Sequence, residues 1–139
     1  AVVNVVLNQK YQSALERNIT MLLSVNDLSG LTMREEDLVT LLVNLLDNAV
    51  EACEKLEENR VIRFKMVLEE GELILSVRNP VAVPVIIDGK RIVTTKNDGG
   101  KHGIGLLNVN GVIERSGGTS ALRCEDGWFC FSAMIPAAE

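Results

Sequence analysis

The chain has 139 residues, the length of one ordinary domain, and a chain of this size buries roughly two thirds of its extended surface on folding. Hydrophobic residues make up 47% and charged residues 24%, a balance that excludes a disordered or fibrous protein. The net charge is −5 and the sequence has no run of Lys and Arg, so we expect no nucleic acid partner. No apolar stretch reaches the ~20 residues that a membrane-spanning helix needs.

The three cysteines, Cys53, Cys124 and Cys130, contain no C-x-x-C pair, and one histidine accompanies them. A zinc site is therefore not expected, and we interpret them as buried free thiols in a reducing, cytoplasmic compartment. The chain does not begin with Met and has no signal-like segment at its start. We expect it to be a fragment of a longer protein.

Apolar residues recur at helical spacing from residue 2 to about residue 17, which predicts a first helix with one apolar stripe. Its members are Val2, Val5, Val6, Leu7, Tyr11, Ala14 and Leu15. The short apolar run at 19–25, followed by a turn cluster, predicts a strand. A second helix is predicted at 35–58, where Thr32 as N-cap and Glu35 would form a capping box.

The second predicted helix is amphipathic. Its apolar side holds Leu38, Leu42, Leu45, Leu46, Ala49, Cys53 and Leu56, and its polar side holds Thr40, Asn44, Asp47, Asn48, Glu51 and Lys55. Asn44 and Asn48 therefore share a face one turn apart. Such a pair can offer oxygen ligands to Mg²⁺ or hydrogen bonds to a ligand; the alternative is an exposed or capping amide.

Alternating apolar residues at 60–68 and 72–77, on either side of Glu70-Gly71, predict a β-hairpin. The segment 78–103 then loses any regular pattern and is rich in Gly, Pro, Asn and Asp. A connection of that length in a compact domain is typical of a functional lid or of disorder.

Helical spacing resumes at Ile104 and ends at Gly117-Gly118. Two strands follow at 119–124 and 128–135, joined by a turn at Asp126-Gly127. Because most strand connections are tight hairpins, we expect a mixed, mostly antiparallel sheet with the helices on one face. The predicted fold class is an α/β two-layer sandwich of the α+β type.

A glycine-rich segment lies where the long loop becomes the last helix. Gly99-Gly100 precede the sequence His102-Gly103-Ile104-Gly105-Leu106. Backbone N–H groups at a helix N-terminus form an anion site, and glycine allows a phosphate to approach them closely. The Walker and Rossmann glycine patterns are absent, so neither of those nucleotide sites is expected. The alternative is a flexible helix entrance.

Four segments in this order resemble the GHKL ATPase superfamily: 44–52, 77–79, 94–96 and 102–106. Within it the chain is most similar to the ATP-binding catalytic domains of sensor histidine kinases, particularly the subgroup that senses peptides or quorum signals and has a reduced first glycine box. The likeness spans about residues 8–136. It implies a Bergerat ATP-binding fold over residues 1–139, with a lid at about 80–103.

The resemblance implies ATP and Mg²⁺ as cofactors. Asn48 matches the amide that ligates Mg²⁺, and Asn44 matches its partner one turn earlier, so both are expected to be catalytic. Hydrolytic relatives have a glutamate at the position of Asn44 that activates water. An amide cannot act as a general base, which favours phosphoryl transfer to a protein over hydrolysis.

The adenine end departs from the family pattern. Most members have D-x-G-x-G after the strand, whereas this chain reads Asn79-Pro80-Val81-Ala82-Val83. The carbonyl oxygen of Asn79 can still accept a hydrogen bond from the adenine amino group; the alternative is that Asn79 only ends a strand. For the phosphates, the resemblance implies contacts from Lys96 and from the segment His102, Gly103, Ile104, Gly105 and Leu106.

The resemblance also implies partners. We expect the γ-phosphoryl group to go to a histidine on a dimerisation domain upstream, and from there to a response regulator. His102 lies inside the nucleotide motif and does not fit that acceptor role. The full-length protein is expected to be a membrane-bound homodimer with this domain in the cytoplasm. The alternatives are an anti-sigma-type serine kinase of the same fold and a degenerate module that binds nucleotide or a partner without catalysis.

Overall fold

The computed structural model describes residues 2–83, 87–88, 91–92 and 101–137, with side chains placed in 2–83 and 105–137. Within these residues, three helices and seven strands follow one another. They are α1 (Val2–Glu16), β1 (Thr20–Val25), α2 (Glu35–Glu54), β2 (Val61–Glu69), β3 (Glu72–Pro80), β4 (Ile87–Asp88), β5 (Arg91–Ile92), α3 (Lys101–Arg115), β6 (Thr119–Glu125) and β7 (Trp128–Pro136).

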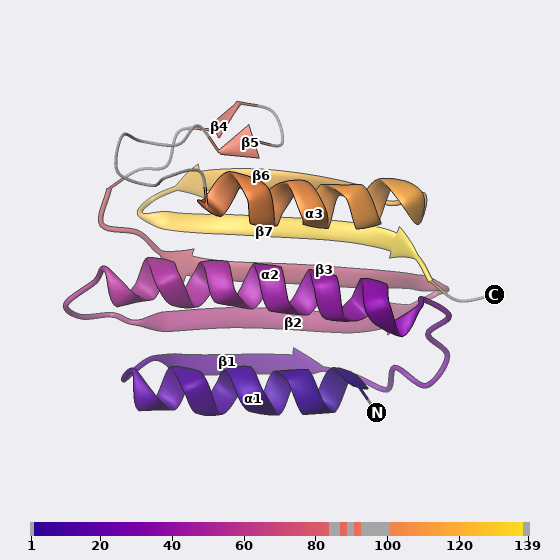
Figure 1. The fold of residues 1–139 in the computed structure, drawn as a ribbon, viewed down its shortest axis with the longest axis horizontal. Coiled ribbons are helices and arrows are strands. Elements are labelled where there is room, and N and C mark those ends of the chain that lie inside the picture. The colour runs from indigo at the N-terminus through magenta and orange to yellow at the C-terminus, as the bar shows by residue number, and fades with distance from the viewer. Residues whose placement is uncertain (1, 84–86, 89–90, 93–100, 138–139) are drawn as a thin grey trace.

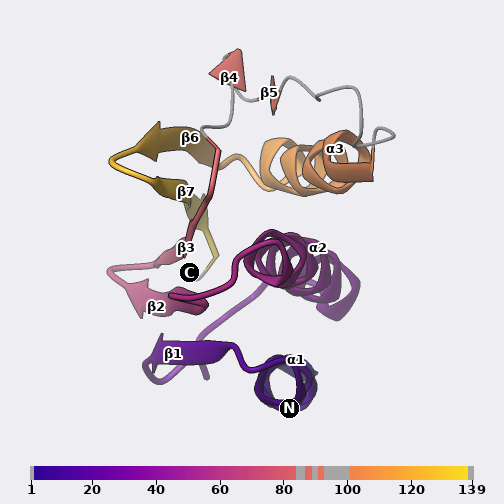
Figure 2. The same ribbon diagram turned by 90° about the vertical axis from the view of Figure 1, so that its left-hand side faces the viewer.

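Five strands form the main sheet in the order β1-β2-β3-β7-β6. β1 and β2 are parallel and the other neighbours are antiparallel, while β4 and β5 pair separately. All three helices lie on one face of the sheet (Figure 1; Figure 2). The predicted two-layer sandwich with a mixed, mostly antiparallel sheet is confirmed.

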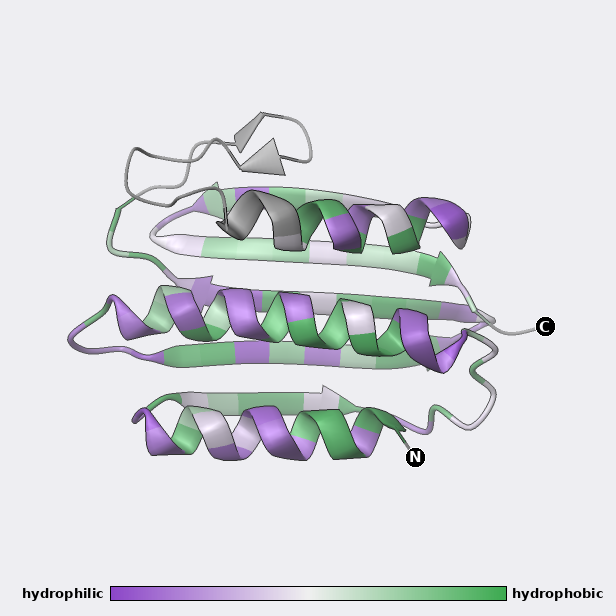
Figure 3. Cartoon of the chain, viewed as in Figure 1, coloured by the Kyte–Doolittle hydropathy of each residue, from purple (hydrophilic) through white to green (hydrophobic). Residues whose placement is uncertain are grey.

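The core lies between the helices and the inner face of the sheet. α2 alternates hydrophobic and hydrophilic residues around each turn, and its apolar side contacts the strands (Figure 3). The largest fully buried side chains come from α2, α3, β2, β3 and β7 and from the connection between α1 and β1. They are Phe64, Phe131, Ile19, Leu41, Leu42, Leu46, Ile62, Met66, Leu73, Leu75, Ile113 and Ile135. The central helix is thereby fixed against the middle of the sheet.

Both predicted hairpin turns are confirmed. The backbone φ angles are 49° at Glu70 and 80° at Gly71, and 53° at Asp126 and 80° at Gly127. Two consecutive positive φ angles characterise the type I′ turn, whose twist matches that of the flanking strands.

The predicted capping box of α2 is wrong. Arg34 occupies the N-cap position without a side-chain hydrogen bond, and the backbone N–H of Thr32 donates to the carbonyl of Ala137 at 2.6 Å. Thr32 is therefore engaged with the C-terminal segment. The helix also ends at Glu54, before the predicted residue 58, with Lys55 as its C-cap, and Asn59 with a left-handed φ of 57° precedes β2.

The apolar stripe of α1 is narrower than predicted. Its buried residues are Val3, Val6, Leu7 and Ala14, whereas Val5 is 58% exposed and Leu15 is 47% exposed. α1 covers only the edge strand β1 and one side of α2, so a single line of side chains suffices (Figure 2). None of the helices in the described part is long and apolar enough to cross a membrane.

The three cysteines are free thiols. Cys53 is fully buried, as predicted, but Cys124 and Cys130 are only partly buried. These two lie on the strands β6 and β7 near the far edge of the sheet, where fewer side chains cover them.

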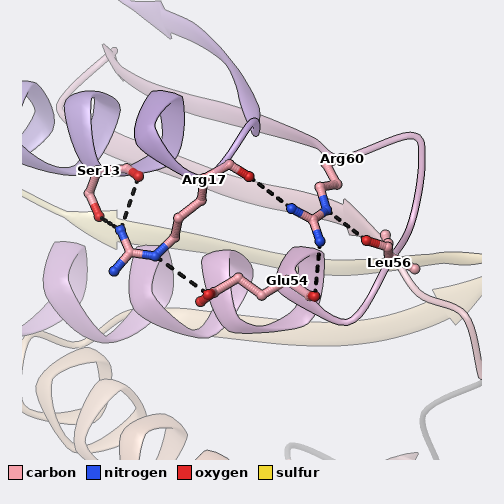
Figure 4. A network of polar contacts seen from close by, with 5 residues as sticks. All are labelled: Ser13, Arg17, Glu54, Leu56 and Arg60. Atoms are coloured by element: carbon pink, nitrogen blue, oxygen red, sulfur yellow. Dashed lines mark hydrogen bonds and ion pairs between the residues drawn. The ribbon is translucent and has the colours of Figure 1, made fainter.

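A polar network joins the C-terminal ends of α1 and α2 (Figure 4). The guanidinium group of Arg60 donates to the backbone carbonyls of Leu56, Arg17 and Glu54 at 2.6, 2.8 and 3.2 Å. Arg17 in turn contacts the carboxylate of Glu54 at 3.5 Å and donates to Ser13. Helix-end carbonyls that lack a partner within their own helix are satisfied in this way.

Candidate nucleotide site

Helices α2 and α3 pack side by side in opposite directions. Arg115, in the last turn of α3, contacts the carboxylate of Asp37 in the first turn of α2 at 3.1 Å. At the other end of α3, Gly105 lies against Asn44. This register brings the N-terminus of α3 to the half of α2 that carries Asn44 and Asn48 (Figure 1).

The carboxamide of Asn44 is held in one orientation. Its Nδ2 atom donates to the backbone carbonyl of Thr40, one turn earlier, at 2.8 Å. Its Oδ1 atom lies 3.5 Å from the position that a Cβ atom would take at Gly105. A side-chain oxygen that could accept a hydrogen bond or bind a cation therefore faces the glycine-rich start of α3. Thr40 was not predicted to be part of this arrangement, although its spacing of four residues from Asn44 is the signal for such a bond.

Asn48 lies one turn beyond Asn44 on the same face and is partly buried. Between them, Asp47 turns toward α1, where the Nζ atom of Lys10 contacts its Oδ1 atom at 2.6 Å. This ion pair holds the carboxylate on the α1 side of the helix. Asn44 remains directed toward the start of α3.

Asn79 is the one buried polar residue in the part of the chain that the structure describes, with 1% of its surface exposed. It lies near the end of β3 on the inner face of the sheet, paired with Phe129 of β7. Its Nδ2 atom donates to the carbonyl of Pro80 at 3.1 Å. Burying an amide is costly unless its hydrogen-bonding groups have partners. A buried amide at the end of a core strand is therefore a candidate ligand-binding group.

The ends of three elements meet on one side of the molecule. β2 follows α2 directly and β3 runs antiparallel to β2, so β3 ends near the C-terminal end of α2. α3 begins at the same side, because it runs antiparallel to α2 (Figure 1). The structure thus places Asn44, Asn48, Asn79, Gly105 and Leu106 on elements that converge there, with Leu106 packed in the core.

The remaining predicted site residues are only partly covered. Lys96 and most of the predicted lid at 80–103 lie outside the described residues. For His102, Gly103 and Ile104 the structure describes the backbone, which belongs to the first turn of α3. The helix thus begins at Lys101, three residues before the predicted start at Ile104.

The GHKL domain family matches residues 33–136, and the chain belongs to this family. This range includes α2, the sheet from β2 onward and α3, and therefore every candidate site residue. No protein of curated function matches the sequence.

Solved structures of histidine kinases share this fold. The nucleotide-free catalytic domain of the histidine kinase ThkA is 21% identical with a TM-score of 0.73, over 98% of this chain and 93% of that one. Full-length ShkA in complex with AMPPNP is 21% identical with a TM-score of 0.74, over 99% of this chain and 29% of that one. The histidine kinase AdeS of Acinetobacter baumannii is 17% identical with a TM-score of 0.69, over 96% of this chain and 64% of that one.

Proposed function

We propose that this domain binds Mg²⁺·ATP and transfers the γ-phosphoryl group to a histidine on a separate dimerisation domain, as part of two-component signalling. The observation that carries the proposal is the contact between the Asn44 amide and Gly105 at the start of α3. It combines a side-chain oxygen ligand with a glycine-lined helix N-terminus, which are the two groups that a metal-bound phosphate requires. ShkA, which has the same fold, is complexed with AMPPNP, and this supports a nucleotide ligand.

In this proposal Asn48 ligates the Mg²⁺. Asn44 lies one turn earlier, on the side of the site where the phosphates would bind. Both residues are amides, which suit a hard cation through their carbonyl oxygens but cannot remove a proton from water. The metal would neutralise charge on the phosphates. The domain would therefore position the nucleotide for transfer to a protein rather than activate water for hydrolysis.

The other residues complete the nucleotide site. Asn79 would read the adenine through its Oδ1 atom, since its Nδ2 atom already donates to Pro80. The backbone N–H groups of 103–106 would bind the phosphates, and Lys96 and His102 would contact them from the lid. The domain would extend over residues 1–139 as the catalytic part of a longer, membrane-bound and dimeric sensor kinase.

Calorimetric titration of the chain with ATP and Mg²⁺ tests the nucleotide proposal. We expect saturable binding by the parent and a loss of affinity of roughly tenfold or more in Asn48→Ala, because one metal ligand is removed. Asn4→Ala, which changes an exposed asparagine of α1, serves as the matched control and should bind like the parent. No binding by the parent, or equal binding by Asn48→Ala, would overturn the site.

Phosphotransfer is tested separately with the histidine-containing dimerisation domain of the parent protein and labelled ATP. Acid-labile phosphate on that domain would support the histidine kinase. Acid-stable phosphate on a supplied protein would support the anti-sigma-type serine kinase instead. ATP binding without transfer to either would leave the non-catalytic binding module as the function.

A further inference from the structure

Four basic side chains gather on the face of the sheet that points away from the helices. They are Arg63 and Lys65 on β2, Arg78 on β3 and Arg123 on β6, and all four are exposed. Arg63 and Lys65 are two residues apart, but Arg78 and Arg123 are distant from them in the sequence, so no basic run is visible there. Among the described elements no helix covers this face (Figure 2). We call these four residues the basic band.

Strand register places three of these arginines in one row across the sheet. Arg63 is opposite Arg78, Arg78 is opposite Cys130 of β7, and Cys130 is opposite Arg123. Neighbouring strands lie about 4.8 Å apart, so the row extends for roughly 14 Å from β2 to β6. Like charges directly opposite one another are destabilising, which makes an anionic ligand the natural complement of this row.

A groove of about 400 Å³ lies along the row, over β3, β7 and β6. Its lining includes the small side chains Ser76, Ser132 and Ala121, which are consecutive cross-strand neighbours. Arg78 and Arg123 belong to the same lining, and so do Glu125 and Asp126, where β6 turns into β7. The groove is therefore hollow in the middle because its side chains are short, with a guanidinium group on the strand at either side and two hydroxyl groups within it.

The positive charge of the band is offset only in part within the protein. In the described part of the chain, Glu125 lies 4.0 Å from Arg123 with both side chains exposed, and Asp126 lines the same end of the groove. The guanidinium of Arg78 instead lies 5.5 Å from the ring centre of Trp128, a cation–π arrangement that leaves its N–H donors available. Exposed ion pairs contribute little, so Arg123 also remains available to another anion.

We propose that this groove binds an acidic, extended segment of a partner protein, laid across the strands along the row of Arg63, Arg78 and Arg123. Carboxylates on alternate residues of an extended segment are about 7 Å apart, so two of them can meet guanidinium groups within the roughly 14 Å row. The hydroxyls of Ser76 and Ser132 would donate to the same carboxylates or to the backbone of the segment.

The distribution of charge favours a short acidic segment over a longer polyanion. Carboxylates border the band at both ends of the strands, with Glu69 and Glu72 at one end and Glu125 and Asp126 at the other. The chain as a whole has a net charge of −5. A nucleic acid or an anionic membrane would extend beyond the band and meet the carboxylates at both ends of the strands, whereas a segment of a few residues along the arginine row would meet only Glu125 and Asp126 at one end.

This surface is separate from the proposed nucleotide site. Arg78 and Asn79 are adjacent on β3, but their side chains point to opposite faces of the sheet, with Arg78 exposed and Asn79 buried. The inference does not depend on the proposed function. A failure of ATP binding would leave it untouched.

Tryptophan fluorescence provides the test, because Trp128 is the one tryptophan of the chain and lines the groove. The probe is the blocked peptide (Glu-Gly)₃, with (Gln-Gly)₃ as its uncharged match. We expect a saturable change in emission with the acidic peptide and none with the neutral one. The backbone amide signals of β3, β6 and β7 in a ¹⁵N spectrum should also shift. This second measurement reports binding by variants in which the substitution itself changes the emission of Trp128.

Arg123→Gln and Arg78→Gln should each weaken the acidic peptide by roughly tenfold, because each removes a charge-assisted hydrogen-bond donor. Arg34→Gln removes the same charge from an arginine at the start of α2 and should bind like the parent. No saturable binding, or equal weakening by Arg34→Gln, would overturn the proposal. So would tighter binding of single-stranded DNA or phosphatidylserine vesicles at the groove, since those would identify a different ligand class.

Discussion

The Oδ1 atom of Asn44 lies 3.5 Å from the place where Gly105 would carry a Cβ atom. Asn44 belongs to the middle of α2 and Gly105 to the first part of α3, so this contact defines how closely the two helices approach at the candidate site. A methyl group fits there at ordinary van der Waals distance. Among the described residues, no packing contact therefore requires a glycine at position 105.

Gly105→Ala should separate stability from ligand binding. We expect the free energy of unfolding to rise or stay unchanged, by up to about 1 kcal/mol, because alanine is favoured over glycine within a helix. ATP affinity should fall, because the added methyl group occupies the space that a phosphate would use next to Asn44. Thermal unfolding and calorimetric titration of the same preparation measure the two effects.

Gly111→Ala is the matched control for that variant. It makes the same change in the same helix, where the added Cβ atom would lie 3.4 Å from the flexible guanidinium end of Arg115. It should raise stability similarly and leave ATP binding unchanged. If Gly105→Ala and Gly111→Ala bind ATP equally well, the space beside Asn44 does not receive a phosphate.

Substitutions of Asn79 should distinguish the role of its Oδ1 acceptor from that of its Nδ2 donor. Asn79→Asp keeps an acceptor for the adenine amino group, so much of the ATP affinity should remain. It removes the donor to Pro80 and buries a carboxylate, so stability should fall by about 1–3 kcal/mol. Asn79→Ala should weaken ATP markedly. Urea unfolding and calorimetry give both quantities, and normal ATP binding by Asn79→Ala would show that adenine is read elsewhere.

The sequence predicted the order of the helices and of the five main-sheet strands, because these elements have strong periodicity and clear turn signals. It did not predict the two-residue strands β4 and β5, which lie in the segment without a regular pattern. Glu70-Gly71 and Asp126-Gly127 are examples in which the residue types alone specify the turn. It also predicted that Asn44 and Asn48 share a face, which follows from helix geometry. Tertiary contacts decided the rest. The backbone N–H of Thr32 donates to the carbonyl of Ala137, and Thr32 does not cap α2. A contact with a residue so distant in the sequence cannot be predicted from a local pattern.

The candidate site, too, could be predicted only in part from the sequence. Its residue types were identified by resemblance, but the orientation of Asn44 depends on Thr40 and the placement of Asp47 depends on Lys10 from another helix. The basic band could not be predicted from the sequence, because strand register brings together residues as distant as Arg63 and Arg123.

Arg60→Ala should destabilise the domain. Its guanidinium group donates to three backbone carbonyls at the ends of α1 and α2 (Figure 4), and these would lose their partner. We expect a loss of about 1–3 kcal/mol in the free energy of unfolding, measured by urea denaturation. Arg60→Lys should recover little of it, since an ammonium group cannot reproduce the planar fork. Arg34→Ala, at an exposed arginine, is the control, and an equal effect there would remove the special role of Arg60.

Cys53 should make stability fall with rising pH in the alkaline range. Burial raises the pKa of its thiol from the usual 9.0 to about 11. Between these values the unfolded chain releases the proton and the folded protein retains it, so the folded state binds more protons and each increase in pH favours unfolding. The contribution is complete below about pH 9 and is lost as the pH passes the folded pKa. Urea unfolding of the parent and of Cys53→Ala across this range measures it: the difference between the two should shrink as the pH rises, and a constant difference would contradict the raised pKa.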